Sequence, residues 1–183
     1  MDNGASSYRR FLDGDESAFD GIMQELFHNL VFFINRYVQD LHAAEDLAID
    51  TLTDLLVHRN RYNFKVTLKT YLFMIGRSRA LDYIKRRKTV EFVSLTAAEL
   101  LPDTGMTLEE TLLSDRRKQA VNNAIAQLSQ DMQAVVHLIY FEDLSYEEAA
   151  KILKKNKKQV DNLLYRAKKE LRILLGEDGE QLL

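Results

Sequence analysis

The sequence predicts an all-α protein made of two small helical domains that an acidic linker joins. A single proline and seven glycines in 183 residues leave few helix breakers, and such a composition favours long helices over many short strands. Apolar residues recur at helical spacing on both sides of a stretch that holds the only proline, Pro102. We therefore expect a first domain over residues 8–88, a linker over residues 89–113 and a second domain over residues 114–176.

The first domain is expected to be a bundle of three or four helices, three of which the sequence places, because helices that share an apolar interior make a compact unit. The buried face of the first helix is expected to consist of Phe19, Ile22, Met23, Leu26, Leu30, Phe33, Ile34 and Tyr37. The second helix covers about residues 41–58, and its apolar side consists of Leu41, Ala44, Leu47, Ala48, Leu52, Leu55 and Leu56. A polar loop over residues 59–67 follows, and the third helix covers about residues 68–87.

The second domain is expected to contain helices near residues 116–128, 131–141, 145–154 and 158–175. Ser145 and Glu148 have the spacing of a capping box, and Asn156 can cap the last helix together with Gln159. Two short helices with a three-residue turn and a basic second helix match a helix–turn–helix. A plain helical hairpin with a charged face is the alternative.

Charge is segregated along the chain, although the net charge is only −3. Ten acidic residues and one base lie between residues 12 and 58, whereas ten bases and one acid lie between residues 59 and 88. Residues 151–172 hold nine bases and two acids. Because lysine and arginine provide most non-specific affinity by neutralising phosphates, two basic blocks indicate two nucleic-acid contacts. Solvated helix faces, the alternative, would usually mix both signs.

The last helix is expected to enter the major groove, with its N-terminal residues against base edges. The residues expected to contact DNA are Lys157, Lys158, Gln159, Asp161, Asn162, Tyr165, Arg166 and Lys169. Gln159 and Asn162 can donate and accept at adenine, and Lys158 can reach guanine. Arg166 and Lys169 are better placed for backbone phosphates.

The basic stretch over residues 59–88 differs in kind, because aromatic residues are interleaved with its cations. This combination suits unpaired bases, which stack on rings while the nucleic-acid backbone meets positive charge. Tyr62 and Phe64 lie in a polar loop and are the better stacking candidates, whereas Phe73 and Tyr83 are assigned to the core.

An acidic stripe lies opposite the apolar side of the second helix. Asp46, Asp50 and Asp54 recur at every fourth residue, and Glu45 lies beside them. Such a stripe repels DNA phosphates. It is either a solvated face or a surface that docks on a basic partner protein.

The composition argues against several other classes of protein. The absence of cysteine excludes disulfides and cysteine-based metal sites or nucleophiles. The first residues lack a signal pattern, and the apolar run from Leu30 to Ile34 is far too short to span a bilayer, so we expect a soluble, cytoplasmic protein without membrane insertion. The four histidines are scattered, and no phosphate-binding loop or nucleophile motif is present. We therefore expect no enzyme activity, metal site or cofactor.

The motifs, taken together and in order, resemble those of the extracytoplasmic-function (ECF) sigma factors, the minimal sigma-70 type with only the region-2 and region-4 domains. The matching motifs are residues 45–52 for region 2.2, residues 67–72, 75–78 and 81–87 for the helix that reads and opens the −10 element, and residues 144–150 and 160–168 for region 4.2, which reads the −35 element. The resemblance covers about residues 8–175.

The resemblance implies a non-catalytic subunit that binds core RNA polymerase, at the β′ clamp helices and the β flap, and promoter DNA in duplex and melted form. Such proteins are commonly held by an anti-sigma factor. The implied polymerase contacts are Glu45, Asp46, Leu47, Asp50, Thr51 and Asp54. The implied contacts with the −10 element are Arg61, Tyr62, Asn63, Phe64, Lys69, Tyr71, Arg77, Ser78, Arg79, Lys85 and Arg86.

The sequence departs from the family pattern in both domains. Tyr71 stands where the family usually has tryptophan, and Ser78 stands where it usually has asparagine. Lys154 takes the place of the turn glycine, at a cost of about 1 kcal/mol if its backbone is left-handed. Asp161 replaces a residue that is often basic, and it can accept from cytosine or hold the neighbouring lysines in place. A stand-alone helix–turn–helix regulator is the alternative function, but it leaves the acidic stripe without a role.

Overall fold

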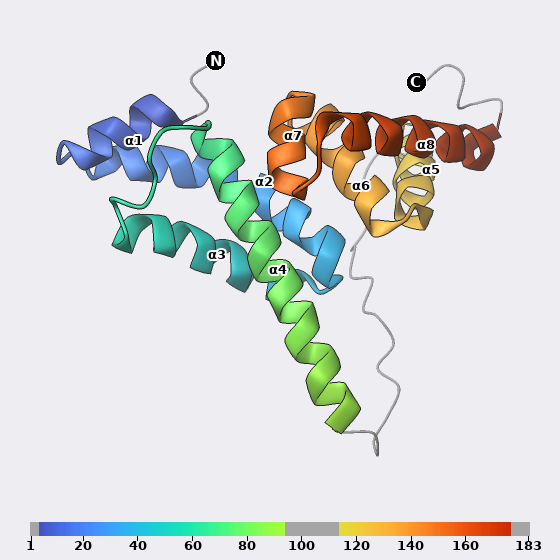
Figure 1. Ribbon diagram of the computed structural model, residues 1–183, viewed down its shortest axis with the longest axis horizontal. Coiled ribbons are helices and arrows are strands. Elements are labelled where there is room, and N and C mark those ends of the chain that lie inside the picture. The colour runs from blue at the N-terminus through green and yellow to red at the C-terminus, as the bar shows by residue number, and fades with distance from the viewer. Residues whose placement is uncertain (1–3, 94–113, 177–183) are drawn as a thin grey trace. The chain divides into compact units, whose positions relative to one another are not determined.

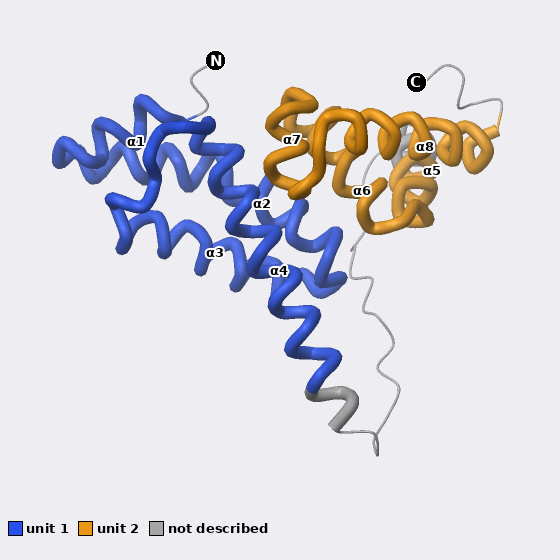
Figure 2. Tube along the Cα trace, in the orientation of Figure 1, with its two compact units in different colours: residues 1–104 blue, residues 105–183 orange. Residues whose placement is uncertain are grey.

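The computed structural model describes residues 4–93 and 114–176, and every regular element within these ranges is a helix. The all-α prediction is therefore confirmed for this part of the chain. The chain divides into two compact units, residues 1–104 and residues 105–183 (Figure 2), and each unit is described by itself. Residues 94–113 of the predicted acidic linker lie outside the described residues.

Unit 1 is a bundle of four helices with a long loop between the last two (Figure 1). The helices are α1 (Ala5–Leu12), α2 (Ser17–Val38), α3 (Leu41–Val57) and α4 (Leu68–Val93). α2 is the central helix, because it packs against α1, α3 and α4. The bundle thus has one helix beyond the three whose ranges the sequence predicts.

The buried face of α2 follows the helical spacing of its apolar residues. Phe19, Ile22, Leu26, Leu30, Phe33, Ile34 and Tyr37 are buried, as predicted, whereas Met23 is half-buried. Phe33 packs on Phe73 of α4 with the ring centroids 4.9 Å apart. α4 also comes close to α2 at Gly76, where an added Cβ would lie 2.8 Å from Leu30 Cδ1. A side chain here would require the Leu30 methyl group to move, so the absence of a Cβ at Gly76 allows α4 to pack closely against α2.

The helix missing from the prediction is α1, and it supplies aromatic side chains to the core. Tyr8 and Phe11 are both buried, and Phe11 packs on Phe19 with the ring centroids 5.1 Å apart. α1 has only eight residues. Two apolar positions in so short a segment do not establish a period, so the sequence pattern did not reveal this helix.

Two predictions about α3 and α4 are wrong. Leu41 and Leu56, predicted on the buried side of α3, are 43% and 37% exposed. They flank a narrower buried strip that is centred on the small residues Ala44 and Ala48. α4 continues to Val93 instead of ending near residue 87, since residues 88–93 contain no glycine or proline that would stop a helix.

Unit 2 contains the four helical segments that the sequence predicts, with ends shifted by about two residues at most. They are α5 (Ser114–Gln127), α6 (Gln130–Val136) continued by the π-helix η1 (His137–Phe141), α7 (Tyr146–Leu153) and α8 (Lys157–Leu175). α8 is the long helix of this unit and packs against α5, α6 and α7. Its buried stripe is Val160, Leu164, Ala167 and Leu171.

No helix within residues 4–93 and 114–176 is long and apolar enough to cross a membrane. In the same ranges, no three acidic or histidine side chains are grouped so that they could hold a metal ion. His42 and Glu45 contact each other at 3.7 Å, but the His42 side chain is 96% exposed, so this is a surface pair.

Candidate nucleic-acid interface

Helices α7 and α8 form the predicted helix–turn–helix, and each begins at a capping box. Ser145 Oγ accepts a hydrogen bond from the Glu148 backbone N–H at 3.3 Å, and the Glu148 carboxylate accepts from the Ser145 backbone N–H at 3.0 Å. Asn156 and Gln159 repeat this arrangement at the start of α8, at 2.8 Å and 2.9 Å. Because capping boxes satisfy N–H groups that a helix start leaves without partners, local sequence sets where both helices begin.

The turn between the two helices passes through Lys154, whose backbone is left-handed with φ 53° and ψ 43°. Its N–H donates to the Lys151 carbonyl at 3.3 Å, and the Lys155 N–H donates to the Ala150 carbonyl at 2.9 Å. These bonds close the C-terminus of α7 in the way that a glycine usually does. A lysine in this conformation brings its Cβ close to the following carbonyl oxygen, which costs about 1 kcal/mol.

Lys154→Gly is therefore expected to stabilise unit 2 by about 1 kcal/mol, because glycine adopts this conformation without the Cβ contact. The matched control is Lys151→Gly, which puts glycine at an exposed position inside α7 and should destabilise the unit by about 1 kcal/mol. Hydrogen exchange of the α7 and α8 amides in the full chain measures both changes. Destabilisation by both variants would contradict backbone strain at Lys154.

The outward face of α8 carries the residues that were predicted to contact DNA. Those residues, all of them exposed, are Lys157, Lys158, Gln159, Asp161, Asn162, Tyr165, Arg166 and Lys169. The Tyr165 side chain is 70% exposed. On the opposite side of the helix, Val160 and Leu164 are buried, so α8 is anchored by one face and presents the other to solvent.

Two side chains at the start of α8 have partners within the protein. Lys157 Nζ pairs with the carboxylate of Glu147 in α7, and this hydrogen bond raises the pKa of Lys157 and lowers the pKa of Glu147. Glu147 is thus the main carboxylate partner of Lys157, and the charge of Asp161 adds a smaller effect in the same direction. The side-chain carbonyl of Gln159 caps the Asn156 N–H, so bidentate binding of adenine by Gln159 would compete with its capping role.

In unit 1, the loop of residues 58–67 is built around an aromatic cluster. The Tyr62 side chain is 3% exposed, and its hydroxyl donates to the Val66 carbonyl at 2.6 Å. Its ring packs against Tyr8, Phe64 and Tyr71 with centroid distances of 5.6, 4.6 and 5.1 Å. In this conformation neighbouring rings cover Tyr62, so the predicted stacking on an unpaired base would need these rings to move.

Local contacts also hold Phe64 and Asn63 of this loop. Phe64 is half-buried with φ 60°, and the Arg9 guanidinium carbon lies 5.0 Å from the centre of its ring. The side-chain oxygen of the exposed Asn63 accepts from the Lys65 N–H at 3.1 Å. Burial raises the pKa of Tyr8 to about 12 and also raises the pKa of Tyr71, so both phenols are neutral near pH 7.

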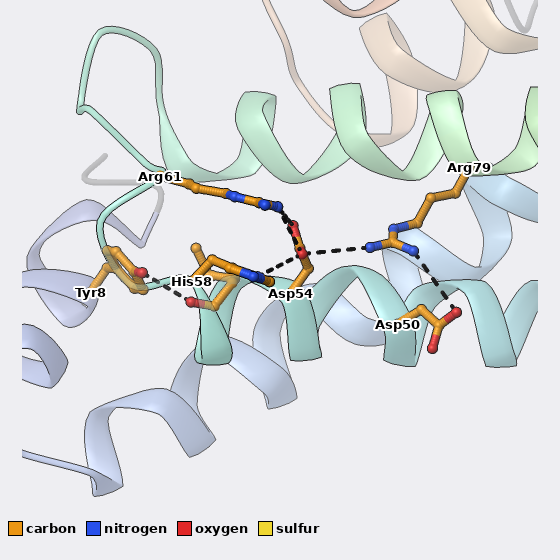
Figure 3. Close-up of polar contacts among 7 residues, drawn as sticks. Tyr8, Asp50, Asp54, His58, Arg61 and Arg79 are labelled. Carbon is orange, nitrogen blue, oxygen red and sulfur yellow. Dashed lines mark hydrogen bonds and ion pairs between the residues drawn. The ribbon is translucent and has the colours of Figure 1, made fainter.

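Two arginines predicted to contact DNA are held by carboxylates of α3 (Figure 3). Arg61 Nη1 lies 3.1 Å from Asp54 Oδ1. The Arg79 guanidinium lies 3.8 Å from Asp54 and 3.9 Å from Asp50. Both arginines thus have acidic partners within the fold, although the Arg61 side chain is 59% exposed, and a charge count along the sequence does not reveal these pairs.

A third arginine on α4 is also held inside unit 1. Arg77 Nε donates to the Tyr37 hydroxyl at 3.2 Å, and its guanidinium carbon lies 5.8 Å from the centre of that ring. The remaining predicted contacts on α4 are more accessible. Lys85 and Arg86 are exposed, and Lys69, Tyr71, Ser78 and Tyr83, which was assigned to the core, are half-buried.

The outward face of α3 combines acidic and apolar side chains. Asp46 and Asp50 are exposed, and Ile49 between them is 47% exposed. Leu56 and Val57 continue this face toward the end of the helix. Helical spacing places Ile49 one turn from Glu45 and Asp46, and the charge pattern of the stripe alone does not reveal this apolar side chain.

Two residues predicted to bind polymerase do not lie on that face. Thr51 is fully buried, and its hydroxyl donates to the Leu47 carbonyl at 2.7 Å, so its side chain has no access to a partner protein. The side chain of Asp54 is only 17% exposed, because it turns toward the loop and α4. Glu45 and Leu47 are half-buried.

Two family models match the chain, one in each unit. Residues 23–90 match Sigma-70 region 2, and residues 118–171 match Sigma-70, region 4. The chain belongs to the sigma-70 family. It is a sigma factor of the ECF type, with region 2 in unit 1 and region 4 in unit 2.

Known relatives resemble this sigma factor over most of their length. RNA polymerase sigma factor YlaC of Bacillus subtilis (strain 168) is 26% identical over 165 residues, which are 90% of this chain and 95% of the relative. ECF RNA polymerase sigma factor SigM of the same organism is 24% identical over 159 residues, 85% of this chain and 93% of the relative. The sigma factor RpoE, solved in complex with the anti-sigma factor NepR from Bartonella quintana, shares the fold with a TM-score of 0.69 at 24% identity, over 87% of this chain and 98% of that one.

As a sigma factor, the protein directs transcription initiation. The helix–turn–helix of α7 and α8 lies within the region-4 match, and the aromatic loop and α4 lie within the region-2 match. A stand-alone regulator is not favoured, because a region-2 domain is present.

Proposed function

We propose that this sigma factor binds core RNA polymerase through the outward face of α3 and reads a bipartite promoter with α8 and with the region around α4. The observation that carries the proposal is the order of the two matches, region 2 and then region 4, together with an exposed basic helix in the second. Its role is binding and positioning, without catalysis or a cofactor. A subunit of RNA polymerase acts in the cytoplasm, and we expect this protein there.

The polymerase contact is assigned to Glu45, Asp46 and Asp50 together with the exposed Ile49. An apolar side chain between carboxylates suits a partner surface that offers both apolar area and basic residues, because interface cores are apolar and charges set orientation. We assign the β′ clamp helices to this face. The β flap, the second polymerase contact, is assigned to region 4.

The −35 element is assigned to α8, whose exposed residues can reach base edges and phosphates of the major groove. The −10 element is assigned to region 2, where Lys69, Tyr71, Ser78, Lys85 and Arg86 remain accessible in whole or in part. Extruding a base costs a few kcal/mol of unstacking energy, which a binding surface can offset without chemistry.

An anti-sigma factor is a further proposed partner. RpoE was solved with the anti-sigma factor NepR, and that sigma factor shares its fold with this chain. Such a partner would have to cover the outward face of α3 or of α8 in order to block polymerase or promoter binding.

The test is run-off transcription with purified components. Core polymerase with this protein is expected to transcribe from promoter fragments that the holoenzyme itself selects from a random library, whereas core polymerase alone is not. If the protein bound such duplexes tightly without polymerase and gave no transcript with it, the stand-alone regulator would be the better description.

Substitutions in α8 should separate the two kinds of DNA contact. Arg166→Ala is expected to weaken binding to all promoter fragments and to reduce the salt dependence by about one phosphate contact. Asn162→Ala is expected to cost about 1–3 kcal/mol at one base pair and so to change sequence preference. Holoenzyme binding to a panel of −35 variants at several salt concentrations measures both. A uniform loss for Asn162→Ala would contradict its assignment to a base.

A further inference from the structure

Asp54 lies at the centre of a group of nitrogen-bearing side chains at the end of α3 (Figure 3). Its carboxylate lies 2.9 Å from His58 Nδ1, accepts hydrogen bonds from Arg61 Nη1 at 3.1 and 3.3 Å, and lies 3.8 Å from Arg79. With a side chain 17% exposed, Asp54 is far more sheltered than Asp50, at 64%. Asp54 therefore already has partners within its own chain: the imidazole of His58 and the guanidinium groups of Arg61 and Arg79.

The partners of Asp54 lie within the aromatic loop and on the helix that follows it. His58 and Arg61 belong to the first half of that segment, and Arg79 projects from α4, which begins directly after it. One carboxylate therefore links the last turn of α3, the loop and α4. The side chains of His58 and Arg61 are 44% and 59% exposed, so the order of this group depends on several contacts that converge on one carboxylate, since an exposed pair alone contributes little.

A second set of contacts holds the same loop from the side of α1. The Tyr8 hydroxyl lies 3.1 Å from the Leu55 carbonyl and 2.9 Å from the Arg59 carbonyl. The Arg59 guanidinium carbon lies 4.4 Å from the centre of the Phe11 ring, and the Tyr8 ring lies 6.3 Å from that of Phe64. The loop is thus fixed by a carboxylate on one side and by aromatic side chains on the other.

We infer that Asp54 is a positioning residue for promoter recognition: it holds the loop of residues 58–67 in one shape, and discrimination at the −10 element depends on that shape although Asp54 touches no DNA. This inference rests on the proposed promoter-reading role of region 2. It replaces the earlier assignment of Asp54 to the polymerase contact. The charge of Asp54 also pairs with Arg61 and Arg79, so that these arginines contribute less to sequence-independent binding of DNA phosphates.

The test is Asp54→Asn, which keeps the size of the side chain and removes its charge. The variant holoenzyme is expected to lose about tenfold or more of its discrimination between the selected −10 sequence and single-base variants of it, a loss comparable to one base contact. Affinity for unrelated single-stranded DNA should rise a few-fold and become more salt-dependent, because two cations are released. Affinity for core polymerase should stay within about twofold of the wild-type value. The reason is that the carboxylate of Asp54 turns toward the loop and α4, away from the docking face of α3.

The matched control is Asp20→Asn, an exposed acid on α2, which should leave discrimination unchanged. In the free Asp54→Asn variant, the rate of amide hydrogen exchange should rise at residues 58–67. Along α2 the rate should remain that of the wild type. Tyr8→Phe, which removes one hydroxyl and keeps the ring, should shift both exchange and discrimination in the same direction by a smaller factor.

Three results would overturn the inference. Unchanged −10 discrimination by Asp54→Asn would mean that the loop shape does not matter. A loss of polymerase affinity would return Asp54 to the docking surface, and a rise of exchange throughout unit 1 would reduce its role to general stability. Failure of the proposed function is distinguishable from these, because the wild-type protein would then give no run-off transcript.

Discussion

Reversing two charges on the outward face of α3, with Asp46→Lys and Asp50→Lys together, is expected to weaken binding to core polymerase by about 100-fold or more. Both carboxylates are exposed and lie next to the exposed Ile49. If the partner surface is basic, the change replaces two attractive pairs by two repulsive ones, and like charges brought together in an interface cost several kcal/mol. Affinity for fluorescently labelled core polymerase and run-off transcription should both fall.

The control for this variant carries the same change in net charge elsewhere on unit 1. Asp20→Lys with Glu25→Lys alters two exposed acids of α2, and polymerase affinity should remain close to that of the wild type. Helicity measured by circular dichroism should be unchanged in both proteins. If the α3 variant kept its affinity, the docking assignment would be wrong, and the acidic stripe would be a solvated face.

Features determined by neighbours in sequence were predictable. The capping boxes at Ser145 and Asn156 use residues three apart, and the turn that includes Lys154 lies between them. The exposed face of α8 was predictable for the same reason, because helical spacing alone assigns one side to the core and the other to solvent. In these cases interactions between residues close in sequence are enough to determine the local structure.

The roles of charged and aromatic residues in region 2 were less predictable, because they depend on which helices meet. The sequence predicts that Arg61 and Arg79 contact DNA. In the folded domain both lie close to Asp54, because α4 and the loop before it pack near the end of α3. Tyr62 lies in a segment that reads as a polar loop, yet α1 packs against it and buries its ring. A contact between residues that are far apart in the chain does not produce a periodic spacing of residues, so the sequence pattern does not predict it.

The same limit applies to a buried pair in region 4. His137 was counted as one of several scattered histidines, but its side chain is 6% exposed and Nε2 lies 3.1 Å from Oε1 of Glu142, whose side chain is 2% exposed. η1 brings the two together, since it holds His137 at its start and ends next to Glu142. The ring of His137 also stacks on Phe141, with centroids 5.6 Å apart.

His137→Leu is expected to destabilise region 4 by about 3 kcal/mol, because it leaves the Glu142 carboxylate buried without the imidazole. This is a large share of the stability of a small domain, which totals only about 5–15 kcal/mol. The loss should appear as faster hydrogen exchange along α6, α7 and α8 of the full chain, with region 2 unaffected. Binding to the −35 element should weaken at temperatures where region 4 partly unfolds.

The double variant His137→Leu with Glu142→Leu separates loss of a partner from loss of packing. Replacing both members of a buried pair by apolar residues is often neutral, whereas removal of one member leaves a charge without compensation. The double variant should therefore recover most of the stability that His137→Leu loses, which gives a coupling free energy of about 1–3 kcal/mol in a double-mutant cycle. Additive losses from the two substitutions would mean that each side chain contributes by its volume alone, and the contact between His137 and Glu142 would then carry no part of the stability of region 4.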